Sequence, residues 1–288
     1  MTGRILDGQL VAMYARSQVK KAVDKLKVFG PIPCLATVLV GEDSASATYI
    51  KNKQKAANEV GIITSDHRLS SNSTQRELLE LIDLLNQDNS VHGILVQLPL
   101  PKNINEFAVI NAINPAKDVD GLSPFNAGML LNGKGTIKPC TPSGIMELLD
   151  FYRVDVNRTD AVIVNRSNLV GKPLALLLLE RNATVTICHS LTKDLNAKLK
   201  SADLIITAVG NRENFKLTSE TVRDGAVVID VGITRIEGKL IGDVDFESVK
   251  EKVSWITPVP GGVGPMTVCM LLKNTLSAAV SLKKEMSQ

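Results

Sequence analysis

The sequence predicts an α/β protein with two α/β domains flanking a cleft, the second of them a Rossmann-like dinucleotide-binding domain. Three observations lead to this prediction. The chain has 288 residues, a length that suits about two domains. Short apolar runs alternate with helical periods along most of it, as in βαβ units with a parallel sheet. The alternation stops between Pro115 and Thr141, in a segment rich in Gly, Asn and Pro, and resumes after Asp160.

In the first half, three apolar runs are expected to be strands, each followed by a helix. The runs are CLATVLVG, GIITSDHRL and GILVQLPLP, and the helices are expected near residues 45–60, 74–86 and 104–112. The segment 115–141 is expected to be an irregular loop, and loops of that length are usually functional or mark a domain boundary. Thr141 and Pro142 then have the residue types of an N-cap and of a first helical turn.

In the second half, five further strands are expected in AVIVN, ATVTICHS, ADLIITAVG, GAVVIDVG and VSWITPVP. Their apolar residues alternate little with polar ones, as in strands buried on both faces. Gly264 and Pro265 begin a last helix that is expected to reach about Lys284. The predicted domains are residues 1–140, with the helix 265–288 packing back on them, and residues 141–264.

Composition argues against several classes of function. Lys and Arg number 33 against 30 Asp and Glu, and aromatic residues make up 3%, so nucleic-acid binding is not expected. The N-terminus does not resemble a signal peptide, and no uncharged apolar run reaches the roughly 18 residues of a membrane helix. The four cysteines are isolated, which indicates neither a disulfide framework nor a metal site and favours a cytoplasmic protein with reduced thiols.

The stretch VIVNRSNLVGKPLALLLL resembles the start of a dinucleotide-binding domain. A strand runs into a short turn and then a helix, whose N-terminal N–H groups and dipole favour a phosphate. Asn165 stands where the first Gly of such a turn belongs. Since Asn is among the residues best able to adopt a positive φ, the tight turn is expected to survive, and Asn165→Gly is expected to leave the fold intact and to keep or improve dehydrogenase activity. The turn alone leaves cofactor binding and a plain connection equally open.

The following strand favours NADP over NAD. An NAD site places Asp or Glu about 20 residues after the turn, on the ribose hydroxyls. Here that position holds His189 and Ser190, and Arg166 supplies a positive charge in the turn. The alternative for Arg166 is a solvated loop cation. Two further strands end in small residues, Ala208-Val209-Gly210 and Val231-Gly232-Ile233, which would let a flat cofactor lie across the sheet edge.

A second group of candidates lies in the first half. Helical spacing places Tyr49 and Lys53 on one apolar face with Ala56 and Val60, although such a lysine often only lays its stem on apolar surface. Gln97 ends an apolar strand, and a ligand or neighbouring backbone could satisfy its hydrogen bonds.

Two loops are also unusual. Asp118 and Asp120 in KDVDG are turn residues by default, or acceptors for a heterocycle; a metal pair is not supported by further ligands. The segment PVPGGVGPMT implies either close approach of the backbone to a ligand or a rigid turn.

Taken in order, Tyr-x-x-x-Lys, VQLPLP, KDVDG, R-S-x-x-V-G-x-P and PVPGGVGPMT resemble the bifunctional methylenetetrahydrofolate dehydrogenase/methenyltetrahydrofolate cyclohydrolase family. The resemblance spans nearly the whole chain. It implies oxidation of 5,10-methylenetetrahydrofolate with NADP, hydrolysis of the methenyl product to 10-formyltetrahydrofolate, and a homodimer. The segment TRIEGKLIGDV is expected to be a hairpin that could pair across the two-fold axis.

The resemblance also implies residue roles. Lys53 would be the acid/base group of the cyclohydrolase, held by Gln97, with Tyr49 lining the folate site and Asp120 accepting hydrogen bonds from the pterin. The other implied residues border the folate (Pro260, Gly261, Gly262) or contact NADP (Asn165, Arg166, Ser167, Ser190, Ile233). Asn165 departs from the Gly of most members, so an alternative is a folate- or nucleotide-binding member with reduced or lost dehydrogenase activity.

Overall fold

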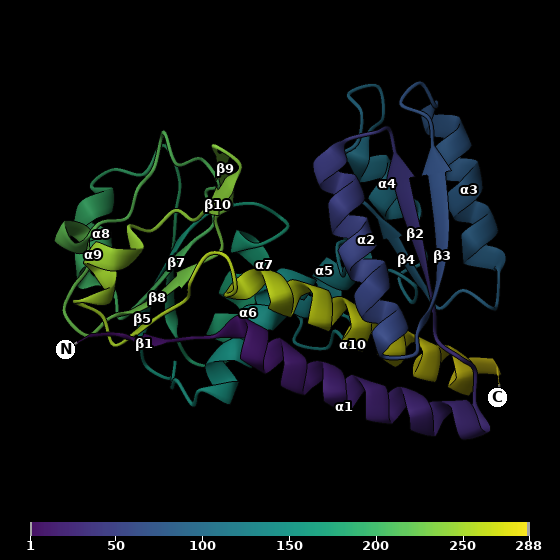
Figure 1. The fold of residues 1–288 in the computed structure, drawn as a ribbon, viewed down its shortest axis with the longest axis horizontal. Helices are drawn as coiled ribbons and strands as arrows, with labels where there is room; N and C mark the ends of the chain where they lie inside the picture. The colour runs from purple at the N-terminus through teal and green to yellow at the C-terminus, as the bar shows by residue number, and fades with distance from the viewer. Residues whose placement is uncertain (1, 287–288) are drawn as a thin grey trace. The chain divides into compact units, whose positions relative to one another are not determined.

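The computed structural model describes residues 2–286, which form two compact units (Figure 1). Unit 1 comprises the chain up to Met13 and Thr141–Thr267, and unit 2 comprises Tyr14–Cys140 and the chain from Val268 onward. Each unit contains a parallel sheet with helices, so the predicted α/β class is confirmed. The first residues group with the second half of the chain, because the short strand β1 (Arg4–Ile5) joins the sheet of unit 1. The division between the units falls within helices α1 (Gly8–Phe29) and α10 (Val263–Met286).

Unit 2 is built on a three-stranded parallel sheet in the order β3-β2-β4. The central strand β2 (Cys34–Val40) is buried along its whole length, as is β4 (Gly93–Val96), whereas the edge strand β3 (Ile63–Leu69) has no fully buried residue. Helices α2 (Ser44–Glu59), α3 (Gln75–Gln87) and α4 (Glu106–Ala112) follow the strands close to the expected positions. The predicted βαβ order of this half is therefore correct.

Buried polar side chains fix the segment after α4. The Lys117 amine donates to the carbonyl oxygens of Leu85, Asn86 and Asp88, at 3.0, 2.7 and 2.7 Å, so a positive charge lies at the C-terminal end of α3. Burial lowers the pKa of Lys117. The lysine therefore anchors the KDVDG loop to the end of a helix.

The expectation that residues 115–141 form an irregular loop is wrong. Helix α5 (Pro124–Leu131) lies within this segment, with Pro124 in its first turn. The Ser123 side chain accepts a hydrogen bond from the backbone N–H of Asn126, which caps the helix. The Ser-Pro pair was the signal for this helix, but the surrounding Gly and Asn residues obscured it.

Helix α6 (Cys140–Phe151) begins one residue before the expected N-cap. Thr141 therefore lies inside the first turn, and its hydroxyl pairs with that of Thr267 at 3.0 Å. The residue types marked the start of the helix to within two positions, which is within the usual uncertainty of a helix boundary.

Unit 1 contains a six-stranded parallel sheet in the order β1-β11-β8-β7-β5-β6. The strands after β1 are β5 (Asp160–Val164), β6 (Thr184–Cys188), β7 (Leu204–Thr207), β8 (Val227–Asp230) and β11 (Trp255–Ile256). Helices α7 (Gly171–Leu179), α8 (Leu195–Ser201) and α9 (Phe246–Lys250) and the short 3₁₀ helix η1 (Ser219–Thr221) connect them. Residues of β5, β7 and β8 are largely buried, as expected. Strand β6 is mostly exposed because it is the edge of the sheet, so full burial was wrong there.

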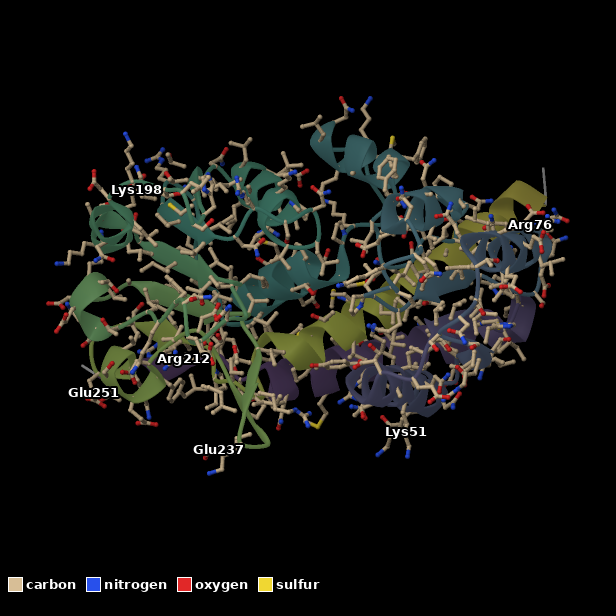
Figure 2. The ribbon with its side chains drawn as sticks, turned by 90° about the horizontal axis from the view of Figure 1, so that it is seen from above. Lys51, Arg76, Lys198, Arg212, Glu237 and Glu251 are labelled. Atoms are coloured by element: carbon tan, nitrogen blue, oxygen red, sulfur yellow. The ribbon has the colours of Figure 1, made fainter. Side chains whose placement is uncertain are left out.

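The expected hairpin is present as β9 (Thr234–Ile236) and β10 (Lys239–Ile241), which pair antiparallel. Its two turn residues, Glu237 and Gly238, have φ values of 50° and 80°. Two positive φ values in succession suit the twist of a two-residue hairpin turn. Figure 2 shows Glu237 at the tip of this hairpin.

One helix among the described residues is long and apolar enough to cross a membrane by length and composition, the segment Val263–Lys283 of α10. Half of its apolar window is buried inside the protein. The four cysteines are buried free thiols. Within residues 2–286, no group of three or more His, Cys, Asp or Glu side chains is placed so that it could bind a metal ion.

Candidate functional site

Lys53 and Gln97 are in direct contact in unit 2. The half-buried Lys53 amine on α2 donates to the Gln97 side-chain oxygen at 3.0 Å. Gln97 follows the end of β4, and its side-chain nitrogen donates to the Leu98 carbonyl at 2.7 Å while its backbone N–H donates to Val38. Because the amide nitrogen is engaged by a carbonyl, the amide oxygen is oriented toward the lysine. Gln97 thus bonds both to neighbouring backbone and to Lys53.

The helical face predicted around Lys53 is present. Ala56 and Val60 are buried, while Lys51 and Lys55 are exposed, and Lys51 projects from the outer side of the helix in Figure 2. Tyr49 precedes Lys53 by one turn and is 43% exposed. An amphipathic ring with this much free surface can pack against an aromatic ligand. The lysine therefore lies at the border between the apolar and the solvated side of α2.

The two carboxylates of KDVDG have different surroundings. Asp118 is 1% exposed and accepts from the N–H groups of Gly121, Leu122 and Ser123 and from the Asn126 side chain. It is a turn residue, the default interpretation, and burial raises its pKa. Asp120 is only partly buried.

Cys140 lies beside the expected folate residues Asp120 and Lys53, a position that its isolation in the sequence does not indicate. Its thiol donates to the Val119 carbonyl at 3.3 Å, and the Asn274 amide lies 3.6 Å from its sulfur. Burial raises the pKa of the Cys140 thiol well above its usual range, the negative charge of Asp120 adds to the increase, and the positive charge of Lys53 opposes it. Asp120 and Lys53 therefore act electrostatically on the same buried thiol.

The turn after β5 in unit 1 is held by the Asn165 side chain. Asn165 is not among the described residues with positive φ, so the expectation that it replaces Gly through its backbone is wrong. Its side-chain oxygen accepts from the N–H groups of Ser167 and Gly171 and from the Ser167 hydroxyl, at 2.8, 3.0 and 2.7 Å. Its side-chain nitrogen donates to the Ala208 carbonyl at 2.6 Å. Asn165 thus caps the start of α7 and ties it to the loop after β7.

Gly171 is required where it stands. A Cβ atom on this residue would lie 2.2 Å from the Asn165 carbonyl oxygen, far inside van der Waals contact. Close packing of helix against strand is one of the uses of glycine in dinucleotide-binding turns. The turn therefore retains Gly171, whereas the first glycine of such turns is replaced by Asn165, whose side chain holds the turn.

Arg166 and Ser190 are both exposed, at the carboxyl ends of the neighbouring parallel strands β5 and β6. Ile233 is 41% exposed in the segment after β8. Ligands of open parallel sheets bind at this edge. Residues 189–190 supply no carboxylate there, so the arrangement fits a cofactor that carries an extra phosphate. Ser167, by contrast, directs its hydroxyl to Asn165 and accepts from the Val170 N–H.

Two buried carboxylates at the same edge were missed in the sequence. Asp230 ends β8 and is 3% exposed, and Asp243 follows β10 and is fully buried. Asp230 accepts from the N–H groups of Gly232, Asp243 and Val244, and burial raises its pKa to about 6. Asp243 accepts from Val209 and Gly210, and burial raises its pKa also. The residues IDVG and IGDVD appear as strand and hairpin ends, and nothing in their pattern distinguishes these carboxylates from exposed ones.

The PVPGGVG segment approaches its own chain closely. A Cβ atom on Gly8 would lie 1.7 Å from the Gly262 carbonyl oxygen, and the Gln9 N–H donates to Gly261 at 3.1 Å. Gly261 has φ +104°, a conformation that favours glycine, and the Val259–Pro260 peptide is cis. Within unit 1 the segment is therefore a rigid turn against the start of α1. The role of Pro260, Gly261 and Gly262 toward folate stays a prediction.

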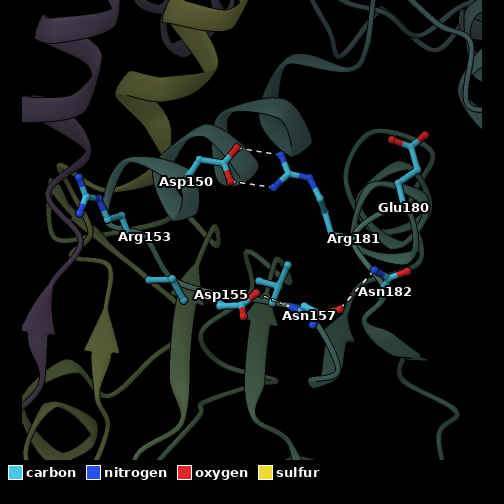
Figure 3. A pocket seen from close by; sticks show the side chains of 9 residues that line it. Asp150, Arg153, Asp155, Asn157, Glu180, Arg181 and Asn182 are labelled. Atoms are coloured by element: carbon cyan, nitrogen blue, oxygen red, sulfur yellow. Dashed lines mark hydrogen bonds and ion pairs between the residues drawn. The ribbon is translucent and has the colours of Figure 1, made fainter.

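A pocket of about 420 Å³ lies elsewhere in unit 1 (Figure 3). Arg181 forms two hydrogen bonds of 2.8 Å with the Asp150 carboxylate at its wall. Arg153 and Asn182, which also line it, have positive φ because each follows the end of a helix in a left-handed capping position. Residues 155–157 and Asn182 precede β5 and β6, so the pocket lies at the amino ends of the strands, away from their carboxyl ends.

The parallel sheet of unit 1, with its exposed polar strand ends, and the lysine–glutamine pair of unit 2 define a two-unit α/β enzyme of the dinucleotide-dependent class. The family models for tetrahydrofolate dehydrogenase/cyclohydrolase match this chain, the catalytic domain over residues 6–120 and the NAD(P)-binding domain over residues 139–283. The chain belongs to the tetrahydrofolate dehydrogenase/cyclohydrolase family, which confirms the predicted resemblance.

Individual relatives are similar over nearly their whole length. A bifunctional protein FolD from Nitrosopumilus maritimus is 56% identical over 279 residues, 97% of each chain. The crystal structure of the bifunctional enzyme FolD from Campylobacter jejuni has 49% identity and a TM-score of 0.94, covering 96% of this chain and 99% of that one. The FolD of Trypanosoma brucei, complexed with NADP cofactor and inhibitor, has 36% identity and a TM-score of 0.93 over the full length of both chains.

Proposed function

We propose that this chain oxidises 5,10-methylenetetrahydrofolate to the 5,10-methenyl form with NADP⁺ and hydrolyses that product to 10-formyltetrahydrofolate. The contact between Lys53 and Gln97 carries the proposal, because it presents an oriented amine on the unit whose sequence matches the catalytic domain of the family. Two observations support both activities: the chain belongs to the family, and it is similar over nearly its whole length to relatives named as bifunctional.

Lys53 serves the hydrolysis as a proton carrier. A water that attacks the methenyl carbon must lose a proton, and the ring nitrogen that leaves when the C–N bond breaks must gain one. The Lys53 amine uses one hydrogen for Gln97, which fixes its direction and leaves its other positions for the substrate and water. Gln97 therefore orients the amine, and Lys53 moves the proton.

Tyr49 and Asp120 bind the folate in this proposal. The exposed Tyr49 ring packs against the aminobenzoyl group, and the partly buried Asp120 accepts hydrogen bonds from the pterin. Both residues belong to unit 2, which we propose as the folate-binding domain, and unit 1 as the NADP-binding domain.

The residues at the strand ends of unit 1 fit NADP. Arg166 supplies a positive charge and Ser190 a hydroxyl for the 2′-phosphate, and residues 189–190 place no carboxylate there to repel it. Ile233 offers apolar surface for the cofactor ring. When bound, NADP⁺ supplies the hydride acceptor, and the protein contributes position and orientation.

Assays of the unmodified protein test this function. With methylenetetrahydrofolate, NADPH absorbance should increase, and NAD⁺ in a parallel reaction should give a lower kcat/KM. With methenyltetrahydrofolate alone, its absorbance should decay faster than in buffer. Hydrolysis without any reduction of either dinucleotide would instead support the alternative, a family member that has lost its dehydrogenase activity.

We further propose a cytoplasmic homodimer that binds neither nucleic acid nor membrane. The four free thiols suit a reducing compartment, and the exposed residues of β9 offer an edge for pairing with a second copy. Sedimentation of the purified protein at twice the mass of one chain would support the dimer, and sedimentation as a monomer at micromolar concentration would contradict it.

A further inference from the structure

Three loops at the carboxyl edge of the unit 1 sheet are tied together by side chains. The Asn165 amide bonds the turn after β5 to the Ala208 carbonyl. The next two residues, Val209 and Gly210, donate their N–H groups to the two oxygens of Asp243, at 2.7 and 3.0 Å. The Asp243 N–H in turn donates to Asp230 at 3.0 Å. The loop after β7 is therefore held on one side by Asn165 and on the other by Asp243.

Asp230 extends the same network to the loop after β8. Its carboxylate accepts from the Gly232 N–H at 3.1 Å and from Val244 at 2.9 Å, and the Thr207 hydroxyl donates to it from the end of β7. Each carboxylate thus spans two chain segments that are distant in sequence. Hydrogen bonds to ionised acceptors are stronger than those between neutral groups, so these ties are rigid.

The two carboxylates occupy space that is free only because the residues facing them are glycines. A Cβ atom on Gly232 would lie 2.1 Å from the Asp243 carboxyl carbon, and one on Gly242 would lie 2.0 Å from an Asp230 oxygen. Arg212 is the positive charge that acts on Asp243, and its guanidinium donates to the Gly242 carbonyl at 3.1 Å. Burying two carboxylates is costly, and apolar residues would serve a sheet core better. Their full hydrogen bonding to loop backbone therefore indicates a task in those loops.

We propose that Asp243, supported by Asp230, is a positioning residue for the dinucleotide, holding the backbone after β7 and β8 in the shape against which the cofactor lies. The proposal rests on the proposed dehydrogenase function. The exposed side chains of Val209 and Ile233 stand on these two loops, at the edge where ligands of parallel sheets bind. Neither carboxylate touches the cofactor, so both act through the backbone.

The test replaces one acceptor oxygen without changing the size of the side chain. In Asp243→Asn, an amide N–H₂ must face one of the two backbone N–H groups, so one hydrogen bond is lost and a repulsion replaces it. The dissociation constant for NADP⁺ should increase by about tenfold, the value that loss of a charged hydrogen bond predicts. The KM for NADP⁺ should increase with it, while hydrolysis of added methenyltetrahydrofolate, which needs no dinucleotide, should keep its rate.

Asp245→Asn is the matched control. This carboxylate lies two residues further on, forms a partly exposed ion pair with Lys216 at 2.7 Å, and accepts neither the Val209 nor the Gly210 N–H. Its substitution should leave NADP⁺ binding within about twofold of the original value, as expected for an exposed pair. A folded Asp243→Asn protein with unchanged NADP⁺ affinity would overturn the proposal.

Amide hydrogen exchange on the unmodified protein keeps the proposal testable if the variant does not fold. The Val209 and Gly210 amides should be protected before any cofactor is added, because Asp243 already holds them. Exchange of both at unprotected rates would overturn the proposal. Failure of the unmodified protein to reduce NADP⁺ would instead contradict the proposed function and leave this exchange result unaffected.

Discussion

The two candidate sites are built in opposite ways. In unit 2, Lys53 is a half-buried side chain whose direction is set by its hydrogen bond to Gln97, and it is available to act on a ligand. At the strand ends of unit 1, the hydrogen-bonding groups of Asn165 and Asp243 are turned inward to the backbone. Under the proposed function, exposed residues such as Arg166 meet the cofactor.

The chemistry that we propose for each unit accounts for this difference. Proton transfer needs a functional group at the reacting atoms, so the side chain itself must be accessible. Hydride transfer needs two rings at the correct distance and angle, so the protein contributes mainly rigid positioning. Substitutions in unit 2 should therefore remove a reaction, whereas those in the unit 1 network should weaken binding by degrees.

The largest effect is expected for Lys53→Met. Methionine retains much of the apolar stem but has no proton to move, so methenyltetrahydrofolate hydrolysis should fall by about 100-fold or more, toward the uncatalysed rate. NADP⁺ binding and the unfolding temperature should persist, and dehydrogenase activity should fall less than hydrolysis. The measurement is the decay of methenyltetrahydrofolate absorbance against a buffer blank. Near-normal turnover would show that Lys53 only covers apolar surface.

Lys51→Met is the matched control for this substitution. Lys51 lies on the same helix but is exposed on another face. It makes no contact with Gln97 among the interactions that the structure describes. Both activities should be retained, and equal losses in the two variants would break the contrast drawn between the units.

Arg166→Ala tests the exposed partner of the cofactor. Loss of a charge-assisted hydrogen bond to the 2′-phosphate should weaken the binding of NADP⁺ by about 1–3 kcal/mol. NAD⁺ lacks this phosphate, so the kcat/KM for NAD⁺ should change less. The ratio of kcat/KM for NADP⁺ to that for NAD⁺ should therefore decrease. Steady-state kinetics with both dinucleotides give the comparison. An equal loss for both would mean that Arg166 shapes the turn and does not read the phosphate.

Asn165→Gly should have a smaller effect, and in the direction opposite to that expected from the sequence. Since Asn165 does not have positive φ, glycine relieves no strain, and it removes the cap on Gly171 and the link to Ala208. The free energy of unfolding should fall by about 1–2 kcal/mol, and NADP⁺ affinity by about fivefold. Thermal unfolding and NADP⁺ titration measure these changes.

Asn168→Gly is the control within the same turn, because that exposed side chain accepts a hydrogen bond from Lys172 and none from the backbone of the turn among the interactions that the structure describes. It should leave NADP⁺ affinity nearly unchanged. Tighter NADP⁺ binding by Asn165→Gly would support the view that Asn165 merely obstructs a glycine turn.

These contrasts show what could be predicted from the sequence. The parallel sheets, the edge carrying Arg166 and Ser190, and the face carrying Lys53 follow from periodicity and strand ends, which are local properties. Family motifs added the partnership of Lys53 with Gln97. A side chain's partner is a tertiary property, however, and both amide and carboxylate side chains can either cap backbone or face a ligand.

For that reason Asp118, Asp230 and Asp243 could not be ranked from their residue type. All three are buried and bonded to loop backbone, while Asp120, in the same loop as Asp118, is not. Helix α5 was missed for the converse reason. Its Ser123-Pro124 start is a clear local signal, but its sequence PFNAGMLL contains several weak helix formers. The helix is stabilised by the burial of Asn126 and Leu130, which is a tertiary effect.

The smallest effect concerns pH. Burial raises the pKa of Asp230 to about 6, above that of an unfolded carboxyl, so its protonated form is favoured by the folded state. Its contribution to stability is therefore fully present below the unfolded pKa and lost as the pH rises through about 6. Cofactor binding should respond in the opposite direction. As the pH falls from 7.5 to 5.5, Asp230 becomes protonated, and its O–H then faces backbone N–H groups that donate to the ionised carboxylate. The hydrogen bonds that hold the loops after β7 and β8 are weakened as a result.

We expect the dissociation constant for NADP⁺ to increase by about threefold more in the unmodified protein than in Asp230→Asn over this range, because the amide does not titrate. Comparing the two proteins removes the titration of the cofactor's own phosphate, which occurs near pH 6. The negative charge of Asp243 adds to the effect of burial in raising the Asp230 pKa, so Asp243→Asn should move the response to lower pH. Hydrolysis of methenyltetrahydrofolate, carried by Lys53 in the other unit, should show no difference between the unmodified protein and Asp230→Asn. Identical pH profiles for NADP⁺ binding in the two proteins would show that the cofactor edge is not held by an ionised Asp230.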